Sequence, residues 1–287
     1  CGIAAGIITG LIPGIHINLL SLILLSMSGY LLGFTSALVL SSFVIAMGIT
    51  HTFLDSIPSI FLGAPDADQA LNALPGHKLL LEGRGLEAVK LTVIGSLMCL
   101  VLTVLFIPIL VPIAPFVYEL TKPYMGWILA AVVSFMILKE KLWKSKLWSL
   151  LIFLLSGILG LIVLNMPNLK QPLFPMLSGL FGVSMLVTSI SNKVNVPKQK
   201  ITENIEVSKK DLGKSLGAAT FAGSLTGLFP GLGAAQAAII GSQLTGHIGT
   251  YSFMVLVGGI NTVNFLFSLV TLYTIEKARN GADRKST

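Results

Sequence analysis

The chain has 287 residues, of which 54% are hydrophobic and only 11% are charged. An ordinary soluble domain carries about 25% charged residues, so this chain has too few polar groups to cover a water-exposed surface, and a soluble globular protein is excluded. The formal net charge of +7 does not predict a nucleic-acid partner. The basic residues stand in short clusters between apolar blocks, as they do in the cytoplasmic loops of membrane proteins.

Apolar blocks in chain order predict an all-α, polytopic protein of the cell membrane, with the lipid bilayer as its surroundings. A helix needs about 20 mostly apolar residues to cross the hydrocarbon core. The predicted segments are 2–27, 33–62, 89–113, 124–138, 147–164, 172–191, 213–245 and 250–275. Under the positive-inside rule we place the basic loops 77–90, 139–146, 192–214 and 276–287 in the cytoplasm, and the loops near 112–123 and 165–172 outside.

A polar linker divides the chain. The stretch 192–214 is charged and longer than most loops. We therefore predict a first transmembrane unit at 1–191, a cytoplasmic linker at 192–212 and a second transmembrane unit at 213–287. The first residue is Cys rather than Met, so we expect a fragment or a processed form with an incomplete second unit. A lipid-anchored Cys terminus is the alternative.

A seven-residue motif occurs twice, once in each unit. Thr9–Ile15 reads TGLIPGI and Thr226–Leu232 reads TGLFPGL, with five of the seven positions identical. Proline removes a backbone donor and glycine permits non-helical angles, so each motif breaks its helix. The freed backbone groups need protein, water or a ligand as partners inside the membrane. We therefore predict two related halves with Pro-Gly-broken or re-entrant helices. Packing kinks are the alternative.

Broken helices at matching places in two halves point to the binding site of a secondary transporter. The half-helix after each break presents N–H groups and a partial positive charge, which suit an anion. Nearby polar side chains either hydrogen-bond the substrate or hold helices together. We predict that a small organic anion binds at residues of both breaks and of the last apolar block: Thr9, Gly10, Pro13, Gly14, His16, Asn18, Thr226, Gly227, Pro230, Gly231, Gly233, Gln236, Asn261 and Asn264.

Two ionisable residues, His51 and Asp55, stand four apart in an apolar block and so share one helical face. An ionisable residue within a membrane segment is by default a hypothesis of function. We predict that this pair couples transport to a proton or sodium gradient, with a buried structural pair as the alternative. The sequence carries no phosphate-binding loop, zinc-ligand spacing or dinucleotide motif, and we predict no cofactor, metal site or catalytic residue.

Three stretches resemble the large membrane subunit of tripartite tricarboxylate transporters, the TctA family. They are Thr9–Asn18, with its Gly-Leu-Ile-Pro-Gly; Asp55–Glu87, with Pro58, Pro65 and Pro75; and Asp211–Ala238, with Gly-Leu-Phe-Pro-Gly-Leu-Gly-Ala-Ala. The resemblance implies a permease for carboxylates that works with a small membrane subunit and an extracytoplasmic solute-binding protein, and an amphipathic stretch before the third predicted segment. Family members are longer, and the chain departs from their pattern at His16, Asn18 and 50–53.

We weigh two other functions. An intramembrane lipid-phosphate enzyme would use His51 and Asp55 as base and orienter, but it needs an arginine at membrane depth for the phosphate, and Arg84 lies in a predicted loop. A lipid carrier would keep the same fold. We predict a secondary transporter and not an enzyme. The solute, the coupling ion and the oligomeric state, a homo-oligomer included, stay open.

Overall fold

The computed structural model describes residues 1–12, 17–62, 70–166, 187, 197–201, 205, 207–229, 232–246 and 248–276. All regular structure in these ranges is helical, and four stretches are long and apolar enough to cross a membrane: Ala37–Phe61, Gly85–Leu138, Trp143–Val163 and Thr250–Ile275. The prediction of an all-helical, polytopic membrane protein is confirmed to this extent.

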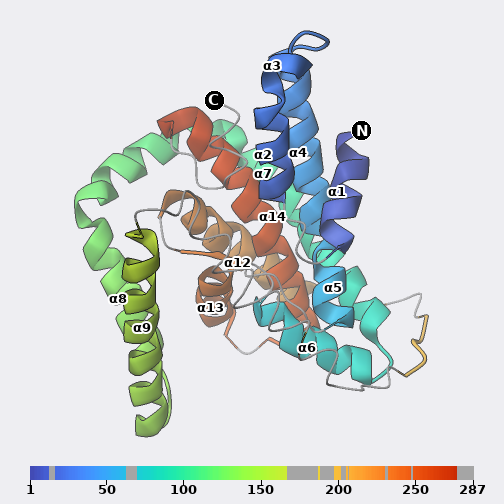
Figure 1. The fold of residues 1–287 in the computed structure, drawn as a ribbon. Helices are drawn as coiled ribbons and strands as arrows, with labels where there is room; N and C mark the ends of the chain where they lie inside the picture. The colour runs from blue at the N-terminus through green and yellow to red at the C-terminus, as the bar shows by residue number, and fades with distance from the viewer. Residues whose placement is uncertain are drawn as a thin grey trace. The chain divides into compact units, whose positions relative to one another are not determined.

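The chain forms two compact units, residues 1–118 with 191–287, and residues 119–190. Both copies of the repeated motif therefore lie in the first unit, and the division at 191 and 213 stays a prediction about the order of segments along the chain. The helices of the first unit are α1 (Gly2–Leu11), α2 (Ile17–Ser26), α3 (Ser28–Leu31), α4 (Ala37–Leu54), α5 (Ser56–Phe61), α6 (Ala70–Leu81), α7 (Gly85–Thr121, its last residues in the second unit), α12 (Lys209–Leu228), α13 (Ala234–Thr245) and α14 (Thr250–Ile275) (Figure 1).

Helices α1 and α12 end at equivalent residues of the repeated motif. After α1 the backbone of Ile12 is extended, at φ −100° and ψ 108°. After α12 the backbone of Phe229 is extended in the same way, at φ −101° and ψ 112°. Helices α2 and α13 begin a few residues later. The helix is therefore interrupted in both copies, while the Pro-Gly residues 13, 14, 230 and 231 lie outside the described residues.

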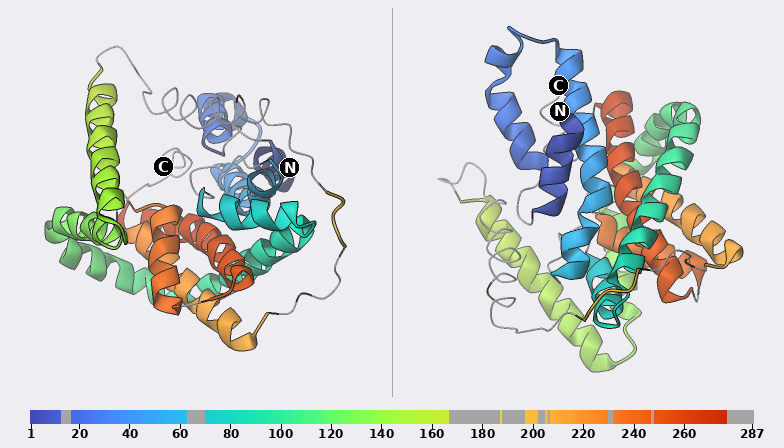
Figure 2. Two further views of the ribbon diagram at one scale, coloured as in Figure 1. Left: turned by 90° about the horizontal axis from the view of Figure 1, so that it is seen from below. Right: turned by 90° about the vertical axis from the view of Figure 1, so that its right-hand side faces the viewer.

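Small residues let α1 lie close along α4, and α12 along α14. A Cβ added to Gly6 would stand 2.5 Å from the Thr50 Cβ. A Cβ added to Gly223 would stand 2.7 Å from the Val263 Cβ. Small side chains are the usual means of close helix packing in membranes, where lipid supplies no hydrophobic drive between helices. Figure 2 shows α1 and α2 beside α4, which they both contact.

The contacts also give the direction of each helix. Along α1 and α4, Gly2 faces Phe43, Gly6 faces Thr50 and Gly10 faces Leu54. Along α12 and α14, Ala219 faces Gly259, Gly223 faces Val263 and Gly227 faces Phe267. Residue numbers rise together in both pairs, so each pair is parallel. Between α4 and α14 they run oppositely, because Gly48 faces Phe265 and Thr52 contacts Thr262, so these two long helices are antiparallel.

Helix α7 corrects the predicted outer loop near 112–123. It runs for 37 residues as far as Thr121 and includes Pro108, Pro112 and Pro115. The prolines signalled a loop, but prolines are tolerated in membrane helices, where neighbouring groups satisfy the freed backbone carbonyls. Helix α6 was likewise absent from the predicted segments, although the resemblance implied an amphipathic stretch there. It contains Pro75.

The predicted basic loops are shorter than expected. Helices α6 and α7 occupy most of 77–90, so only residues 82–84 form the turn between them. Residues 143–146 belong to α9 (Trp143–Leu164), and residues 209–214 belong to α12. Lysine is a good helix former, so a cluster of basic residues marks the end of an apolar run without ending the helix. The segment predicted at 172–191 lies outside the described residues, except for residue 187.

The second unit contains η2 (Lys122–Tyr124), α8 (Met125–Leu138) and α9. Helices α8 and α9 lie side by side (Figure 1). None of the apolar window of α9 is buried inside the protein, as expected of a helix whose surface meets lipid.

The linker contacts the turn between α6 and α7. The backbone N–H of Gly85 donates to Gln199 Oε1 at 2.7 Å, and the Gln199 amide donates to the Leu80 carbonyl at 3.1 Å. The backbone N–H of Lys200 donates to the Gly83 carbonyl at 2.8 Å. The two predicted basic loops therefore meet at Gln199 and Lys200, and their placement in the cytoplasm stays a prediction.

The start of α14 lies at the same place. Tyr251 donates its hydroxyl to Glu87 Oε2, and the Arg84 guanidinium stands 4.9 Å from the centre of the Tyr251 ring. Helix α14 then runs for 26 residues, about 39 Å at 1.5 Å per residue. If α14 spans the membrane, residue 276 emerges on the opposite face. The cytoplasmic placement of 276–287 stays a prediction, because residues 277–287 lie outside the described residues.

Candidate functional site

A chain of polar contacts joins α1, α4 and α14. Thr9 Oγ1, in the last turn of α1, lies 3.1 Å from His51 Nδ1. His51 Nε2 lies 3.9 Å from Asp55 Oδ2. The amide of Asn261 donates to the same carboxylate oxygen at 2.7 Å. Thr9, Asp55 and Asn261 are only 3%, 6% and 3% exposed. The structure thus joins the predicted His51–Asp55 pair to two residues, Thr9 and Asn261, that were predicted as parts of the substrate site.

Thr226 and Asn264 form an equivalent contact in the second half. Thr226 Oγ1, in the last turn of α12, lies 2.7 Å from Asn264 Oδ1 and 2.5 Å from the Gly223 carbonyl. Thr9 Oγ1 likewise lies 3.2 Å from the Gly6 carbonyl. In both halves, then, a threonine just before the break bonds to its own helix and to a polar side chain of the long neighbouring helix.

Two further threonines connect these contacts. Thr52 Oγ1 lies 3.2 Å from Thr262 Oγ1, and the Asn261 amide also donates to the Thr52 carbonyl at 3.3 Å. Thr52 follows His51, and Thr262 stands two residues before Asn264. A helix rises by about 1.5 Å per residue, so the Thr9–His51 contact and the Thr226–Asn264 contact lie within about 5 Å of one another along the helix axes. Both broken helices end at one depth in the α4–α14 bundle.

The sequence did not single out Thr262 as a site residue, and it named Thr52 without assigning it a role. Threonine is common in membrane helices, and it usually bonds to its own backbone, as Thr52 does to the Ile49 carbonyl at 2.9 Å. Only the spacing of Thr262 between Asn261 and Asn264, on one side of α14, could have signalled it.

Other predicted residues have structural contacts. Gln236 Oε1 accepts from the backbone N–H of Gly233 at 2.9 Å, so this side chain caps the start of α13. Gly10 and Gly227 are the close-packing points against Leu54 and Phe267. These contacts hold the helices that border the breaks, and they neither require nor exclude a bound solute.

Five predicted residues lie outside the described residues: Pro13, Gly14, His16, Pro230 and Gly231. Asn18 belongs to α2, but the position of its side chain is not described. The roles assigned to these six residues stay predictions.

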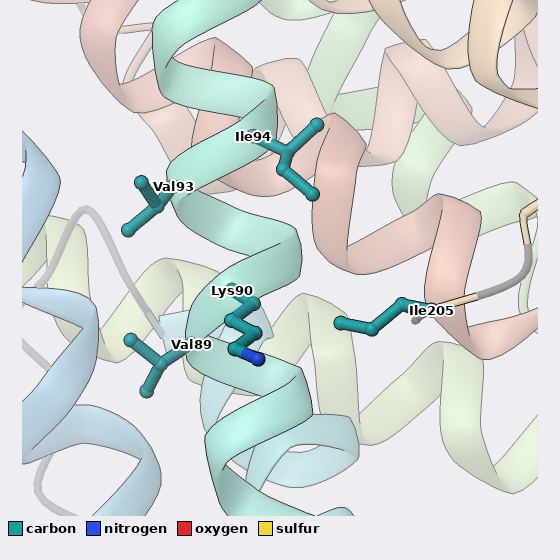
Figure 3. A pocket seen from close by; sticks show the side chains of 5 residues that line it. All are labelled: Val89, Lys90, Val93, Ile94 and Ile205. Atoms are coloured by element: carbon teal, nitrogen blue, oxygen red, sulfur yellow. The ribbon is translucent and has the colours of Figure 1, made fainter. Parts of the chain in front are cut away.

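A cavity of about 420 Å³ lies elsewhere, on the outer side of α7. It is lined by Val89, Lys90, Val93 and Ile94 of α7 and by Ile205, which comes from a separate segment (Figure 3). No predicted site residue contributes to its lining.

The arrangement can be compared with known proteins. The sequence matches the Tripartite tricarboxylate transporter TctA family over residues 1–283. The chain belongs to this family. The TctA-family chain is also 33% identical to the uncharacterized protein MJ1079 of Methanocaldococcus jannaschii, over 99% of this chain and 70% of that protein. No solved structure matches.

Membership of the TctA family makes this chain a transporter subunit of the cell membrane rather than an enzyme. The suspected resemblance is confirmed. For the enzyme alternative, the position of Arg84 agrees with this result: its guanidinium contacts Glu87 and Tyr251 at the start of α7 and α14.

Proposed function

We propose that this chain is the carrier subunit of a secondary transporter, and that it holds a small carboxylate anion between its two helix breaks. The observation that carries the proposal is the repeated arrangement at the ends of α1 and α12. Each helix is followed by a residue with an extended backbone and has a buried threonine in its last turn. Each threonine contacts the long helix that packs beside it, and the two contacts lie at the same depth.

An inverted relation between the halves supports the proposal. Helices α1 and α4 are parallel, and so are α12 and α14, with glycine contacts four residues apart in both pairs. Helices α4 and α14 are antiparallel, so the two pairs point in opposite directions. Contacts across the bundle also recur in reverse. Gly48 of α4 faces Phe265 of α14. The equivalent of Gly48 in α14 is Asn261, and the equivalent of Phe265 in α4 is Thr52. These two residues are also in contact. Inverted repeats whose broken helices meet near the midplane are a common architecture of secondary transporters.

The proposed site suits an anion. The first N–H groups of a helix have no partner within that helix, and the macrodipole adds a partial positive charge. Helices α2 and α13 each begin just after a break, so both half-helices present such ends. The side-chain N–H groups of Asn264 add donors near the second break, while the hydroxyls of Thr9 and Thr226 hold the ends of α1 and α12 in place. We assign the carboxylate groups of the substrate to these ends.

The His51–Asp55 pair provides the proposed coupling to an ion gradient. His51 of this pair is in hydrogen-bond contact with Thr9. Binding of an ion at the pair therefore changes a contact in the last turn of α1. As partners we propose a small membrane subunit and an extracytoplasmic solute-binding protein, which with this chain would make up the three parts of a tripartite transporter. They would deliver the anion to the side opposite the linker.

Uptake of labelled citrate into proteoliposomes, made with the chain and its native partner subunits, tests the proposal. Thr226→Val removes the hydroxyl that joins the last turn of α12 to Asn264 beside the proposed site, and a buried acceptor left without its donor costs about 1–3 kcal/mol, so uptake should fall about tenfold. Thr274→Val is the matched control, because Thr274 bonds to the Val270 carbonyl of its own helix. Equal uptake by the two variants, or gradient-independent uptake by the wild type, would contradict the proposal.

A further inference from the structure

We infer that the ion transported with the anion is a proton, and that His51 carries it. The inference rests on the proposed function and names its coupling ion. It comes from comparing the two halves of the molecule, because each half holds the same threonine contact with a different partner.

Position 51 has a neutral counterpart. Gly6 faces Thr50 as Gly223 faces Val263, and Gly10 faces Leu54 as Gly227 faces Phe267. This register makes Asn264 the equivalent of His51, and Ser268 the equivalent of Asp55. Asn264 holds Thr226 at 2.7 Å as His51 holds Thr9 at 3.1 Å. A neutral amide is therefore sufficient to anchor the end of a broken helix, and the imidazole adds an ability that anchoring does not need.

That ability is exchange of a proton near neutral pH. Thr9 has one hydroxyl proton and two acceptors within reach, the Gly6 carbonyl at 3.2 Å and His51 Nδ1 at 3.1 Å. When Nδ1 carries a proton, it donates to Thr9, and the Thr9 hydroxyl donates to Gly6. When Nδ1 is bare, it accepts the Thr9 proton instead. The protonation of His51 thus changes the hydrogen bond at the last turn of α1, next to the break.

Asp55 lies beside the imidazole on the side away from Thr9. Its Oδ2 lies 3.9 Å from Nε2, and Asn261 holds the same oxygen in place from α14. In the cycle that we propose, His51 takes one proton from the outer solution, the anion binds, and the proton leaves to the cytoplasm with the anion. The proton is conserved, and no other chemistry is needed.

No other charged group among the described residues competes for this role on the packed elements. Helices α1, α2 and α5 contain no Asp, Glu, Lys, Arg or His, and the only ionisable side chains of α14 are Tyr251 and Tyr273. Tyr251 contacts Glu87 at the helix start, and Tyr273 is exposed. On α4 itself, His51 is the only charged or ionisable residue before Asp55.

The experiment measures protons and citrate together. Proteoliposomes of the chain with its partner subunits, in sodium-free buffer, contain a trapped pH dye, and labelled citrate is added outside at lower pH. Wild-type protein should accumulate citrate and acidify the lumen. His51→Asn reproduces the second half of the molecule, so it should fold, should lose gradient-driven accumulation and should retain exchange of citrate for citrate. His77→Asn is the control, because His77 contacts the Ile60 carbonyl away from the pair.

Each outcome decides the inference. Retained proton-driven accumulation in His51→Asn overturns it. So does wild-type uptake that requires sodium and ignores the pH gradient, and this second result needs no variant and leaves the proposed function intact. Absence of citrate uptake and exchange in every gradient overturns the proposed function, and this inference with it. Lumen acidification by the wild type, together with loss of accumulation but not of exchange in His51→Asn, supports the inference.

Discussion

At the scale of residues, the carboxylate of Asp55 depends on a donor from another helix. Asn261 donates to Asp55 Oδ2 at 2.7 Å, with both side chains buried. Asn261→Leu removes this donor, and we expect a loss of about 1–2 kcal/mol in the free energy of unfolding, since side-chain hydrogen bonds in membrane proteins range up to about 1.7 kcal/mol and a buried acceptor is left behind. Unfolding by SDS titration in micelles measures it.

Asn165→Leu serves as the control for that variant. Asn165 is exposed and donates to the Leu161 carbonyl of its own helix, so its loss should change the free energy of unfolding by less than about 0.5 kcal/mol. In Asp55→Asn, the added loss from Asn261→Leu should shrink, as a double-mutant cycle would show. Equal effects of Asn261→Leu with and without Asp55 would mean that the contact does not stabilise the protein.

Sequence reasoning found His51, Asp55, Asn261 and Asn264 because polar side chains are conspicuous in an apolar segment. It could not predict their partners. The register between α4 and α14 depends on where glycines permit close approach, and the sequences of the two helices match too weakly to align by themselves. Packing supplies that register, with Gly48 against Phe265 and Thr52 beside Thr262.

At the scale of elements, glycines set the distance between paired helices. A Cβ at Gly223 would lie 2.7 Å from the Val263 Cβ, closer than real Cβ contacts allow. Gly223→Ala should therefore force α12 away from α14 and cost about 1–3 kcal/mol in unfolding free energy. Gly6→Ala should have a comparable cost, because Gly6 occupies the equivalent place between α1 and α4.

Gly217→Ala is the control on the same helix. Nothing lies within 4 Å of a Cβ added there, and alanine is a better helix former than glycine by about 1 kcal/mol. This variant should therefore be as stable as the wild type or more stable. If Gly6→Ala and Gly223→Ala are also neutral, the equivalence of the two helix pairs loses its physical basis.

The helix interruptions were predictable because proline and glycine change the backbone locally. Both α1 and α12 end at the leucine two residues before the Pro-Gly of the motif. The ends of other helices were not predictable. In water a proline usually ends a helix, but α7 continues through three prolines. In a membrane, ending the helix would leave more backbone N–H and C=O groups without partners than a proline within the helix does, and this costs more free energy. Local sequence therefore predicts a break reliably only when a second, independent copy supports it.

At the scale of the whole molecule, the contact between the linker and the α6–α7 turn was not predictable, since it depends on hydrogen bonds between backbone groups and Gln199. It brings Gln199 and Lys200 of the linker against the turn at 82–84, so the two predicted basic loops meet there. The positive-inside rule predicts that this meeting point lies in the cytoplasm. The same rule predicts that 276–287 lies there too, whereas α14, if it spans the membrane, would carry residue 276 to the opposite face.

Labelling of single cysteines decides the orientation of α14. In a Cys1→Ser background, where Cys99 is buried, a cysteine is introduced at Ile201 in the linker or at Glu276 after α14, both of which are exposed. Because α14 starts beside Arg84 and crosses about 39 Å, a membrane-impermeant maleimide should label Ile201→Cys in inside-out vesicles and Glu276→Cys in right-side-out vesicles. Labelling of both from one side would mean that α14 returns within the membrane, and the inverted pairing of α4 with α14 would then describe two re-entrant segments instead of two spans.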